Sequence, residues 1–357
     1  MMESGTEPGD VPGTDHKPRP TMRDIAARAG VSSMSVSRAL RGHSGVSQET
    51  RAQVMAAVKE LGYQPNEFAR QLRTGGPTHL IALIVSHLSN PFYAMLAVGV
   101  ERIAAEHGAR VLIMSTHSDL ATEREVVEDL SRRRVDGVII VPATPDHRHL
   151  AGLGGPTTPV VFATAPPNGI DASAVLVDDF GGMHRLCSHL LADGHRSIGL
   201  LGLNRAMWTG SERFRGYAAA HAEAGIPVDT QLITEHAGDI GWAIQETRRL
   251  LELPSPPTAI IAANNLMTVG ALRATQAVAS EAVVTGFDDI PMADLFRMPL
   301  TLVRFDAERI GARSAELLFH SHADRDDPSS RTRAKPVRDV LPTKLVHYGA
   351  TDDRRGT

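Results

Sequence analysis

The chain has 357 residues but a single cysteine, Cys187. It cannot form an intrachain disulfide, which fits a protein of a reducing compartment. No apolar run approaches the ~20 residues that a membrane-spanning helix requires. Segment 1–18 is polar and lacks the basic start and apolar centre of a secretion signal, so we expect a disordered leader there. These absences predict a cytoplasmic protein with no membrane partner.

The sequence also lacks the short motifs by which many enzymes and metal sites are found. It contains no G-x-S-x-G, no P-loop and no glycine-rich dinucleotide fingerprint. The 16 histidines form no H-E-x-x-H motif, and the lone cysteine has no partner for a cysteine-based metal site. We therefore expect no catalytic residues, no metal ion and no cofactor.

Charge is unevenly distributed along the chain. The segment from Lys17 to Arg73 holds ten basic and four acidic residues, a net charge of +6. The whole chain carries −4, so the remainder carries −10. A basic segment joined to an acidic body is typical of a nucleic-acid-binding module fused to another domain, although a solvated helical face gives the same pattern.

Three short helices are predicted in this basic segment. Thr21 and Asp24 are spaced as a capping box for the first helix, and Gly30 can take the left-handed conformation that ends it. A serine cap then precedes a second helix that runs to about Leu40. The apolar residues of segment 47–61 have the spacing of a third helix. Two helices joined by a tight glycine turn make the helix-turn-helix plan.

Beyond residue 78, apolar strands alternate with amphipathic helices. Repeated strand–helix units predict an α/β protein with parallel sheets covered by helices on both faces. About 270 residues exceed one typical sheet, so we expect two Rossmann-like subdomains with a cleft between them. Strands are expected at residues 79–85, 110–114, 136–142, 198–202, 259–262 and 283–286, and helices at residues 91–107, 121–133, 181–192, 212–224, 242–251 and 267–279.

Short strings typical of one protein family occur at matching spacing from about residue 19 to residue 346. They include Thr21-Met22-Arg23-Asp24-Ile25-Ala26, Val36-Ser37-Arg38-Ala39-Leu40, Ser89-Asn90-Pro91-Phe92-Tyr93, Gly194-His195-Arg196-Ser197-Ile198, Gly286-Phe287-Asp288-Asp289 and Leu341-Pro342-Thr343. In these strings the chain resembles the LacI/GalR (lactose-repressor) family of transcriptional regulators. The resemblance implies an all-α helix-turn-helix head joined to a bilobed, periplasmic-binding-protein-like core.

The resemblance also implies domain boundaries. We expect a leader at residues 1–18, the head at 19–64, a hinge helix and linker at 65–78, the core at 79–346 and a flexible tail at 347–357. Within the core, the N-subdomain is expected at about residues 79–177 and 304–335, and the C-subdomain at about 178–303 and 336–346.

By resemblance, the head and the hinge supply the DNA contacts. The expected residues are Thr21, Met22, Ser32, Ser33, Met34, Ser35, Ser37, Arg38, Tyr63, Asn66, Arg70, Leu72 and Arg73. Ser33 and Met34 occupy the two positions that choose the operator sequence, although Met34 can instead pack partly against the head's own core. Arg38 can donate to N7 and O6 of guanine, or can only clamp a phosphate.

The hinge contains an apolar residue, Leu72, in a short basic segment with nothing of its own to bury against. The resemblance implies that Leu72 enters the minor groove as a wedge at the central base step, which bends the duplex. Packing of Leu72 against a partner's hinge helix is the alternative, and both can hold at once.

The resemblance places an effector site in the core, in the cleft between the lobes. The expected residues are Ser86, Phe92, Asp119, Thr164, Arg213, Trp242, Asn264, Asn265 and Asp288, with Trp208 as a further candidate. For Ser86, Phe92, Asp119 and the two tryptophans, ordinary packing in the core or at the surface is an equal alternative. Arg213 and Asp288 are expected to face each other across the two lobes and to bind one small polar ligand.

The expected pocket departs from the pattern of sugar binders. Thr164 stands where these often carry an aspartate, and Asn264-Asn265 stands where an Asn–Asp pair is common. Fewer carboxylates mean fewer acceptors for sugar hydroxyls, so a typical monosaccharide fits this pocket less well than the family pattern implies. The resemblance still favours a sugar or a related metabolite as the effector, and a ligand other than a sugar, or no ligand at all, is the alternative.

These expectations combine into a cytoplasmic, nucleoid-associated homodimer that binds a palindromic double-stranded operator. A small-molecule effector modulates its affinity for DNA. The family resemblance favours repression over activation of transcription. A solute-binding protein would need a secretion signal and no head. An enzyme would need a convergent constellation of reactive groups, which the sequence does not offer.

Overall fold

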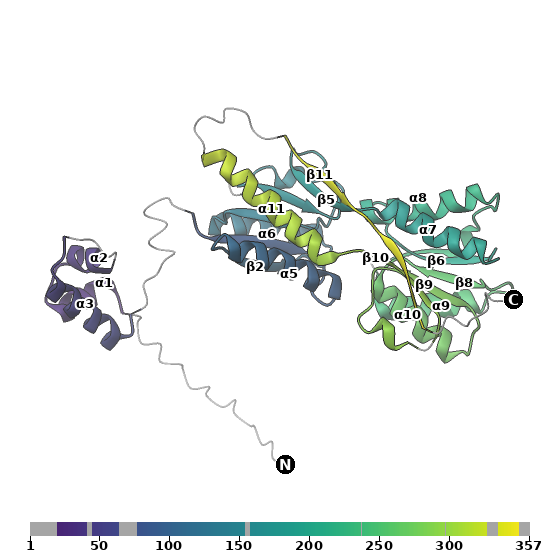
Figure 1. The fold of residues 1–357 in the computed structure, drawn as a ribbon, viewed down its shortest axis with the longest axis horizontal. Coiled ribbons are helices and arrows are strands. Elements are labelled where there is room, and N and C mark those ends of the chain that lie inside the picture. The colour runs from purple at the N-terminus through teal and green to yellow at the C-terminus, as the bar shows by residue number, and fades with distance from the viewer. Residues whose placement is uncertain are drawn as a thin grey trace, which may run out of the picture. The chain divides into compact units, whose positions relative to one another are not determined.

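The structure, a computed structural model, describes residues 20–40, 45–63, 77–153, 158–236, 238–296, 298–326 and 335–349. The chain divides into two compact units, residues 1–76 and residues 77–357 (Figure 1). The predicted leader lies outside the described residues, as does segment 65–76 with the predicted hinge helix.

The described part of the first unit consists of three helices: α1 (Met22–Ala29), α2 (Ser33–Leu40) and α3 (Gln48–Leu61). The predicted capping box is present, because the Asp24 amide donates to the Thr21 hydroxyl and the Thr21 amide donates to the Asp24 carboxylate. Gly30 has φ 66° and ends α1 in the left-handed conformation. The three helices bury a small common core around Ile25.

The second unit consists of two lobes, each built around a six-stranded sheet (Figure 1). The first sheet has the strand order β11-β5-β4-β3-β1-β2, and all of its strand pairs are parallel. Its strands are β1 (Leu80–Val85), β2 (Arg110–Ser115), β3 (Gly137–Ile140), β4 (Val160–Ala163), β5 (Ser173–Val177) and β11 (Arg338–Leu341). Helices α5 (Pro91–Glu106), α6 (Leu120–Arg133) and α11 (Ala307–Asp326) pack on it, and η1 (Arg148–Leu150) follows β3.

The second sheet has the order β12-β10-β9-β8-β6-β7, with β12 antiparallel to β10. Its strands are β6 (Ile198–Leu203), β7 (Ile233–His236), β8 (Ala259–Ala262), β9 (Val283–Phe287), β10 (Leu300–Arg304) and β12 (Lys344–Tyr348). Its helices are α7 (Asp179–Ala192), α8 (Trp208–Glu223), α9 (Ile240–Leu251) and α10 (Asn265–Ala277), with the short helices η2 (Thr230–Leu232) and η3 (Ala293–Leu295) between elements.

The chain crosses between the lobes after β5, after β10 and after β11, and the last crossing runs as an extended segment from one sheet to the other (Figure 1). Segment 336–346 is expected from the sequence to lie entirely in the C-subdomain. That boundary is wrong for β11, which pairs in parallel with β5 of the first sheet. Residues 347 and 348, expected in the tail, belong to β12. A short crossing at residues 342 and 343 lets both strands extend a sheet edge.

Helices α5 and α11 of the first lobe pack so closely that their crossing leaves no room for a side chain. A Cβ on Gly99 of α5 would overlap the carbonyl oxygen of Glu308 and lie 2.7 Å from the amide nitrogen of Ala312 on α11. Gly311 of α11 faces the backbone of Leu96 in the same way. The two glycines therefore set the distance between α5 and α11.

Replacing Gly99 by alanine is expected to lower the free energy of unfolding by about 1–3 kcal/mol, because the backbones must move apart to admit the methyl group. Urea unfolding of the full chain measures the loss. Gly152→Ala is the matched control, since a Cβ at that position meets no atom of the described residues within 4 Å. Equal stability of the two variants would show that the helix crossing is not tight.

Candidate functional site

Helix α2 exposes one side to contact with another molecule. Ser33, Met34 and Arg38 are exposed, and their spacing places them on one side of the helix. Met34 is 65% exposed and does not pack against the core of the three helices, which disfavours the alternative of a core residue. Small polar, apolar and basic side chains on one helix are the groups that read base edges in the major groove.

Arg38 differs from its neighbour Arg28 in its environment. The Arg28 guanidinium pairs with Glu60 at 2.6 Å, whereas Arg38 makes no ion pair within the described part of the chain. A basic side chain without an acidic partner can neutralise a phosphate or donate to a guanine edge.

The other predicted DNA-binding residues of the head also contribute to the structure of the head itself. Thr21 and Ser32 accept hydrogen bonds from the amides of Asp24 and Ser35, respectively, near the starts of α1 and α2. Met22 and Tyr63 pack against the core. Ser35 and Ser37 are half-buried on α2. The predicted residues Asn66, Arg70, Leu72 and Arg73 lie outside the described residues.

In the second unit, a cleft with a volume of about 700 Å³ lies between the two lobes and is lined by both. Ser86 follows β1, Thr164 follows β4 and Asp288 follows β9, so the cleft lies at the carboxyl ends of parallel strands. That edge is where open α/β sheets bind their ligands. Aromatic rings of Phe92, Tyr93, Trp208 and Phe305 form apolar parts of the wall.

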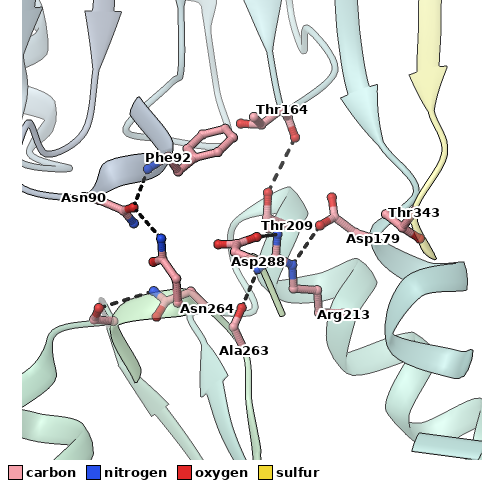
Figure 2. A network of polar contacts seen from close by, with 12 residues as sticks. Asn90, Phe92, Thr164, Asp179, Thr209, Arg213, Ala263, Asn264, Asp288 and Thr343 are labelled. Atoms are coloured by element: carbon pink, nitrogen blue, oxygen red, sulfur yellow. Dashed lines mark hydrogen bonds and ion pairs between the residues drawn. The ribbon is translucent and has the colours of Figure 1, made fainter. Parts of the chain in front are cut away.

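A buried arginine, Arg213 of α8, organises the polar part of this cleft (Figure 2). Its Nε donates to Asp179 Oδ1 at 2.8 Å, its Nη1 donates to the carbonyl of Ala263, and its Nη2 lies 3.5 Å from Asp288 Oδ1. Its guanidinium also lies over the Phe287 ring, 3.6 Å from the ring centroid. The arginine is thus held by contacts on all sides.

Both carboxylates of this cluster are deeply buried. Burial raises the pKa of Asp179 to about 6 and also raises the pKa of Asp288, while the neighbouring Arg213 charge acts in the opposite direction. Perturbed carboxyl groups that line a cleft are typical of binding sites.

Three non-glycine residues that line the cleft, Ser118, Thr164 and Asp288, adopt the left-handed backbone region that favours glycine. Asp288 has φ 71° and Thr164 has φ 68°, and both follow directly on a strand of a sheet. Such conformations cost free energy and persist where the surrounding structure holds them in place. They turn Thr164 and Asp288 towards the cleft that these residues line.

Hydrogen bonds cross the cleft from one lobe to the other (Figure 2). The Asn265 side-chain amide donates to the Asn90 side-chain oxygen at 2.9 Å, and the Thr209 hydroxyl lies 3.5 Å from the Thr164 carbonyl. Trp208 of the second lobe also packs against the hydrophobic core of the first. These contacts join the two lobes across the cleft.

Six of the nine predicted effector residues line the cleft, and Trp208 does so as well. The six are Ser86, Phe92, Thr164, Arg213, Asn264 and Asp288. The expectation that Arg213 and Asp288 come from opposite lobes is wrong. Both belong to the second lobe, where they pair with each other.

The other three predicted residues do not line the cleft. Asp119 caps α6 by accepting from the amide of Thr122 at 2.7 Å. Trp242 packs against the main hydrophobic core. Asn265 is 3% exposed, and its side-chain amide donates a hydrogen bond to Asn90. Asp119 therefore serves a helix end, Trp242 the hydrophobic core and Asn265 the contact between the lobes.

Asp179 is a buried, charged residue of the cleft that was not expected from the sequence. It begins α7 immediately after the buried strand β5, at the carboxyl end where ligand-binding side chains gather. The acidic pair Asp178-Asp179 after an apolar run was the available signal. Asp178 caps the helix by accepting from the Gly181 amide at 2.9 Å, which leaves Asp179 for the cleft.

Two structural features are absent from the described part of the chain. No helix there has the length and apolar character that crossing a lipid bilayer requires. No group of three or more His, Cys, Asp or Glu residues there is placed to hold a metal ion.

Comparison with known proteins identifies both units. Residues 21–66 match the family described as bacterial regulatory proteins, lacI family. Residues 78–335 match the periplasmic binding proteins and sugar binding domain of the LacI family.

Curated relatives align over nearly their whole length. The HTH-type transcriptional regulator CelR of Thermobifida fusca is 32% identical over 344 residues, which are 93% of this chain and 98% of the relative. The HTH-type transcriptional regulator DegA of Bacillus subtilis is 31% identical over 334 residues, with 91% and 96% covered.

Solved structures show the same fold. A complex of the transcriptional regulator CelR with cellobiose has a TM-score of 0.67 at 30% identity and covers 93% of this chain and all of the other. A lac repressor dimer bound to operator and the anti-inducer ONPF has a TM-score of 0.72 at 26% identity, with 92% and 98% covered. The chain is thus a DNA-binding transcriptional regulator rather than an enzyme, and it belongs to the LacI family of bacterial regulatory proteins.

Proposed function

We propose that this regulator is a repressor that binds a palindromic operator as a homodimer. Its operator affinity changes when a small polar effector, a sugar or a related metabolite, occupies the cleft between the lobes. The observation that carries the proposal is a cleft lined by both lobes, in a chain that also presents an exposed recognition helix. A ligand that contacts both lobes has different affinities for different lobe angles, and this difference is what shifts an equilibrium.

The relatives support this proposal by their printed names. The HTH-type transcriptional repressor PurR of Mannheimia succiniciproducens and the ribose operon repressor of Escherichia coli are each 29% identical to the chain. The related solved structures hold cellobiose in one case and an operator with an anti-inducer in the other.

Dimer formation is supported by an apolar surface on the first lobe. Met95 and Val98 of α5 and Ile113 of β2 are exposed, and β2 is the edge strand of its sheet. Val98 and Ile113 also line a shallow groove of about 360 Å³. A second copy of the chain is the occupant that we propose, because a two-fold protein matches a palindrome and one head offers few base contacts.

Replacing Arg38 by alanine tests the recognition surface. If Arg38 reads guanine, the variant should lose about 1–3 kcal/mol of operator affinity and should relax the preference at one position in each half-site. Titration against every single-base variant of an operator selected from random duplexes measures both effects. Arg28→Ala is a matched control, since Arg28 is already paired with Glu60. Equal weakening on all sequences would show that Arg38 contacts phosphate alone.

A further inference from the structure

The Asp179 carboxylate has one satisfied oxygen and one unsatisfied oxygen. Oδ1 accepts from Arg213 Nε, whereas the buried Oδ2 has no hydrogen-bond partner in the structure. The side chain is 1% exposed, lines the cleft, and directs its second oxygen away from the arginine (Figure 2). A buried acceptor without a donor is costly, so this oxygen marks a place where a bound molecule would gain by donating.

Arg213 is not free to meet an anionic ligand. Nε is taken by Asp179, Nη1 by the carbonyl of Ala263 and one face by the Phe287 ring, while Nη2 is shared with Asp288. One guanidinium compensates two buried carboxylates. With both of them ionised, this cluster carries a net charge of −1 in a poorly solvated place.

The rest of the cleft wall adds no compensating positive charge. Among the described residues that line it, Arg213 is the sole lysine or arginine, and the other charged members are Glu235 and Asp239. Glu235 is paired with Arg205, and Asp239 caps α9. The cleft as a whole is therefore acidic.

We propose that Asp179 is an effector-contacting residue that restricts the cleft to neutral ligands rich in hydroxyl groups and excludes ligands that carry a carboxylate or a phosphate. The inference rests on the proposed function and names the chemical class of its effector. A ligand hydroxyl donates to Asp179 Oδ2, and such bonds to an ionised acceptor are stronger than neutral ones. An anionic group would be desolvated beside an excess of negative charge. The rings of Phe92, Trp208 and Phe305 cover the apolar faces of the ligand.

The binding test uses matched probes on the full chain. Calorimetry compares neutral mono- and disaccharides, cellobiose among them, with the corresponding uronic acids and sugar phosphates. Wild type is expected to bind at least one neutral probe roughly tenfold or more tightly than its anionic counterparts. Tighter binding of an anionic counterpart, or no binding of any neutral probe, would overturn the inference.

Two variants assign the effect to Asp179. Asp179→Asn leaves Arg213 paired with Asp288, so the variant should fold. It should bind the neutral probe roughly tenfold more weakly than wild type does, and it should discriminate less against anionic probes. Glu223→Gln removes the same charge from the exposed end of α8, where Glu223 contacts His184, and should change neither. Unchanged affinity in Asp179→Asn would remove Asp179 from the site.

The pH dependence of ligand affinity can be measured on wild type alone. If Asp179 had a purely structural role, its titration would not change that affinity. Burial raises the pKa of Asp179 to about 6, and the charged groups that act on it are Arg213, Asp288 and Glu212. A hydroxyl donor favours the ionised carboxylate, so affinity for the neutral probe should rise by several-fold from about pH 5 to about pH 7.5. A flat profile in wild type contradicts the inference, and Asp179→Asn should show a smaller pH dependence than wild type, because Asp288 is then the remaining buried carboxyl group of the cluster.

Operator binding separates this inference from the proposed function. If an anionic probe binds in the cleft and changes operator affinity, the proposed regulation stands and the inference on ligand class fails. If a neutral probe binds through Asp179 without changing operator affinity, the ligand class stands and the proposed regulation fails.

Discussion

Replacing Arg213 by leucine is expected to lower the free energy of unfolding of the two-lobed unit by about 3–5 kcal/mol near neutral pH. The change removes the one positive charge that compensates Asp179 and Asp288, whose side chains are 1% and 10% exposed. It also leaves the carbonyl of Ala263 without its donor. The loss comes mainly from two uncompensated buried carboxylates and not from the ion pairs themselves.

The penalty of Arg213→Leu should depend on pH in a defined direction. Burial already raises the pKa of both carboxyl groups in the native state, so the folded protein takes up protons more readily than the unfolded chain as pH falls. Without the arginine this tendency grows, and the loss of stability should be smaller at about pH 5 than at about pH 7.5.

Urea unfolding at these two pH values measures the effect. Arg215→Leu is the matched control on the same helix, because the Arg215 side chain is 60% exposed and an ion pair made by an exposed arginine contributes about 0–1 kcal/mol. A loss for Arg213→Leu no larger than that of the control, or independent of pH, would contradict the account of the cluster.

The sequence was most informative where local chemistry decides the structure. The capping box of Thr21 and Asp24 and the glycine ends of α1 and α3 are signals within one turn of the element that they define. The six core strands and six core helices expected from the sequence lie within four residues of their observed bounds, because the apolar period changes clearly between strand and helix. The sequence did not predict the remaining strands and α-helix of the core, which are β4, β5, β7, β10, α11, β11 and β12.

The candidate site was less predictable, because an acidic or amide residue after a strand has several uses. Asp119, Asp178 and Asp179 all follow strands, yet the first two cap helices and the third lines the cleft. Asn265 stands next to a cleft residue but bonds to the other lobe. Which partner such a side chain finds depends on distances between segments far apart in the sequence.

The lobe boundary shows the same limit. β11 and β12 are separated by two residues, yet they extend different sheets. Neither strand was expected from the sequence, because each is a short edge strand whose residues are exposed or half-buried and form no buried apolar run.

Replacing Asp288 by asparagine is expected to abolish the effector response while leaving operator binding without effector intact. The variant keeps Arg213 compensated by Asp179, so the cleft remains stable. Asparagine is preferable to alanine here, because residue 288 has φ 71° and asparagine tolerates that conformation better. What is lost is a charged acceptor that lines the cleft.

The most direct measurement is a titration of a selected operator by wild type and by Asp288→Asn, with and without the probe that binds wild type in calorimetry. For wild type, the probe should change operator affinity by roughly 5–150-fold, the range of a coupling of about 1–3 kcal/mol. For Asp288→Asn, operator affinity should match that of ligand-free wild type at every probe concentration. An equal response in both proteins, or no response in wild type, would contradict the claim that this cleft controls DNA binding.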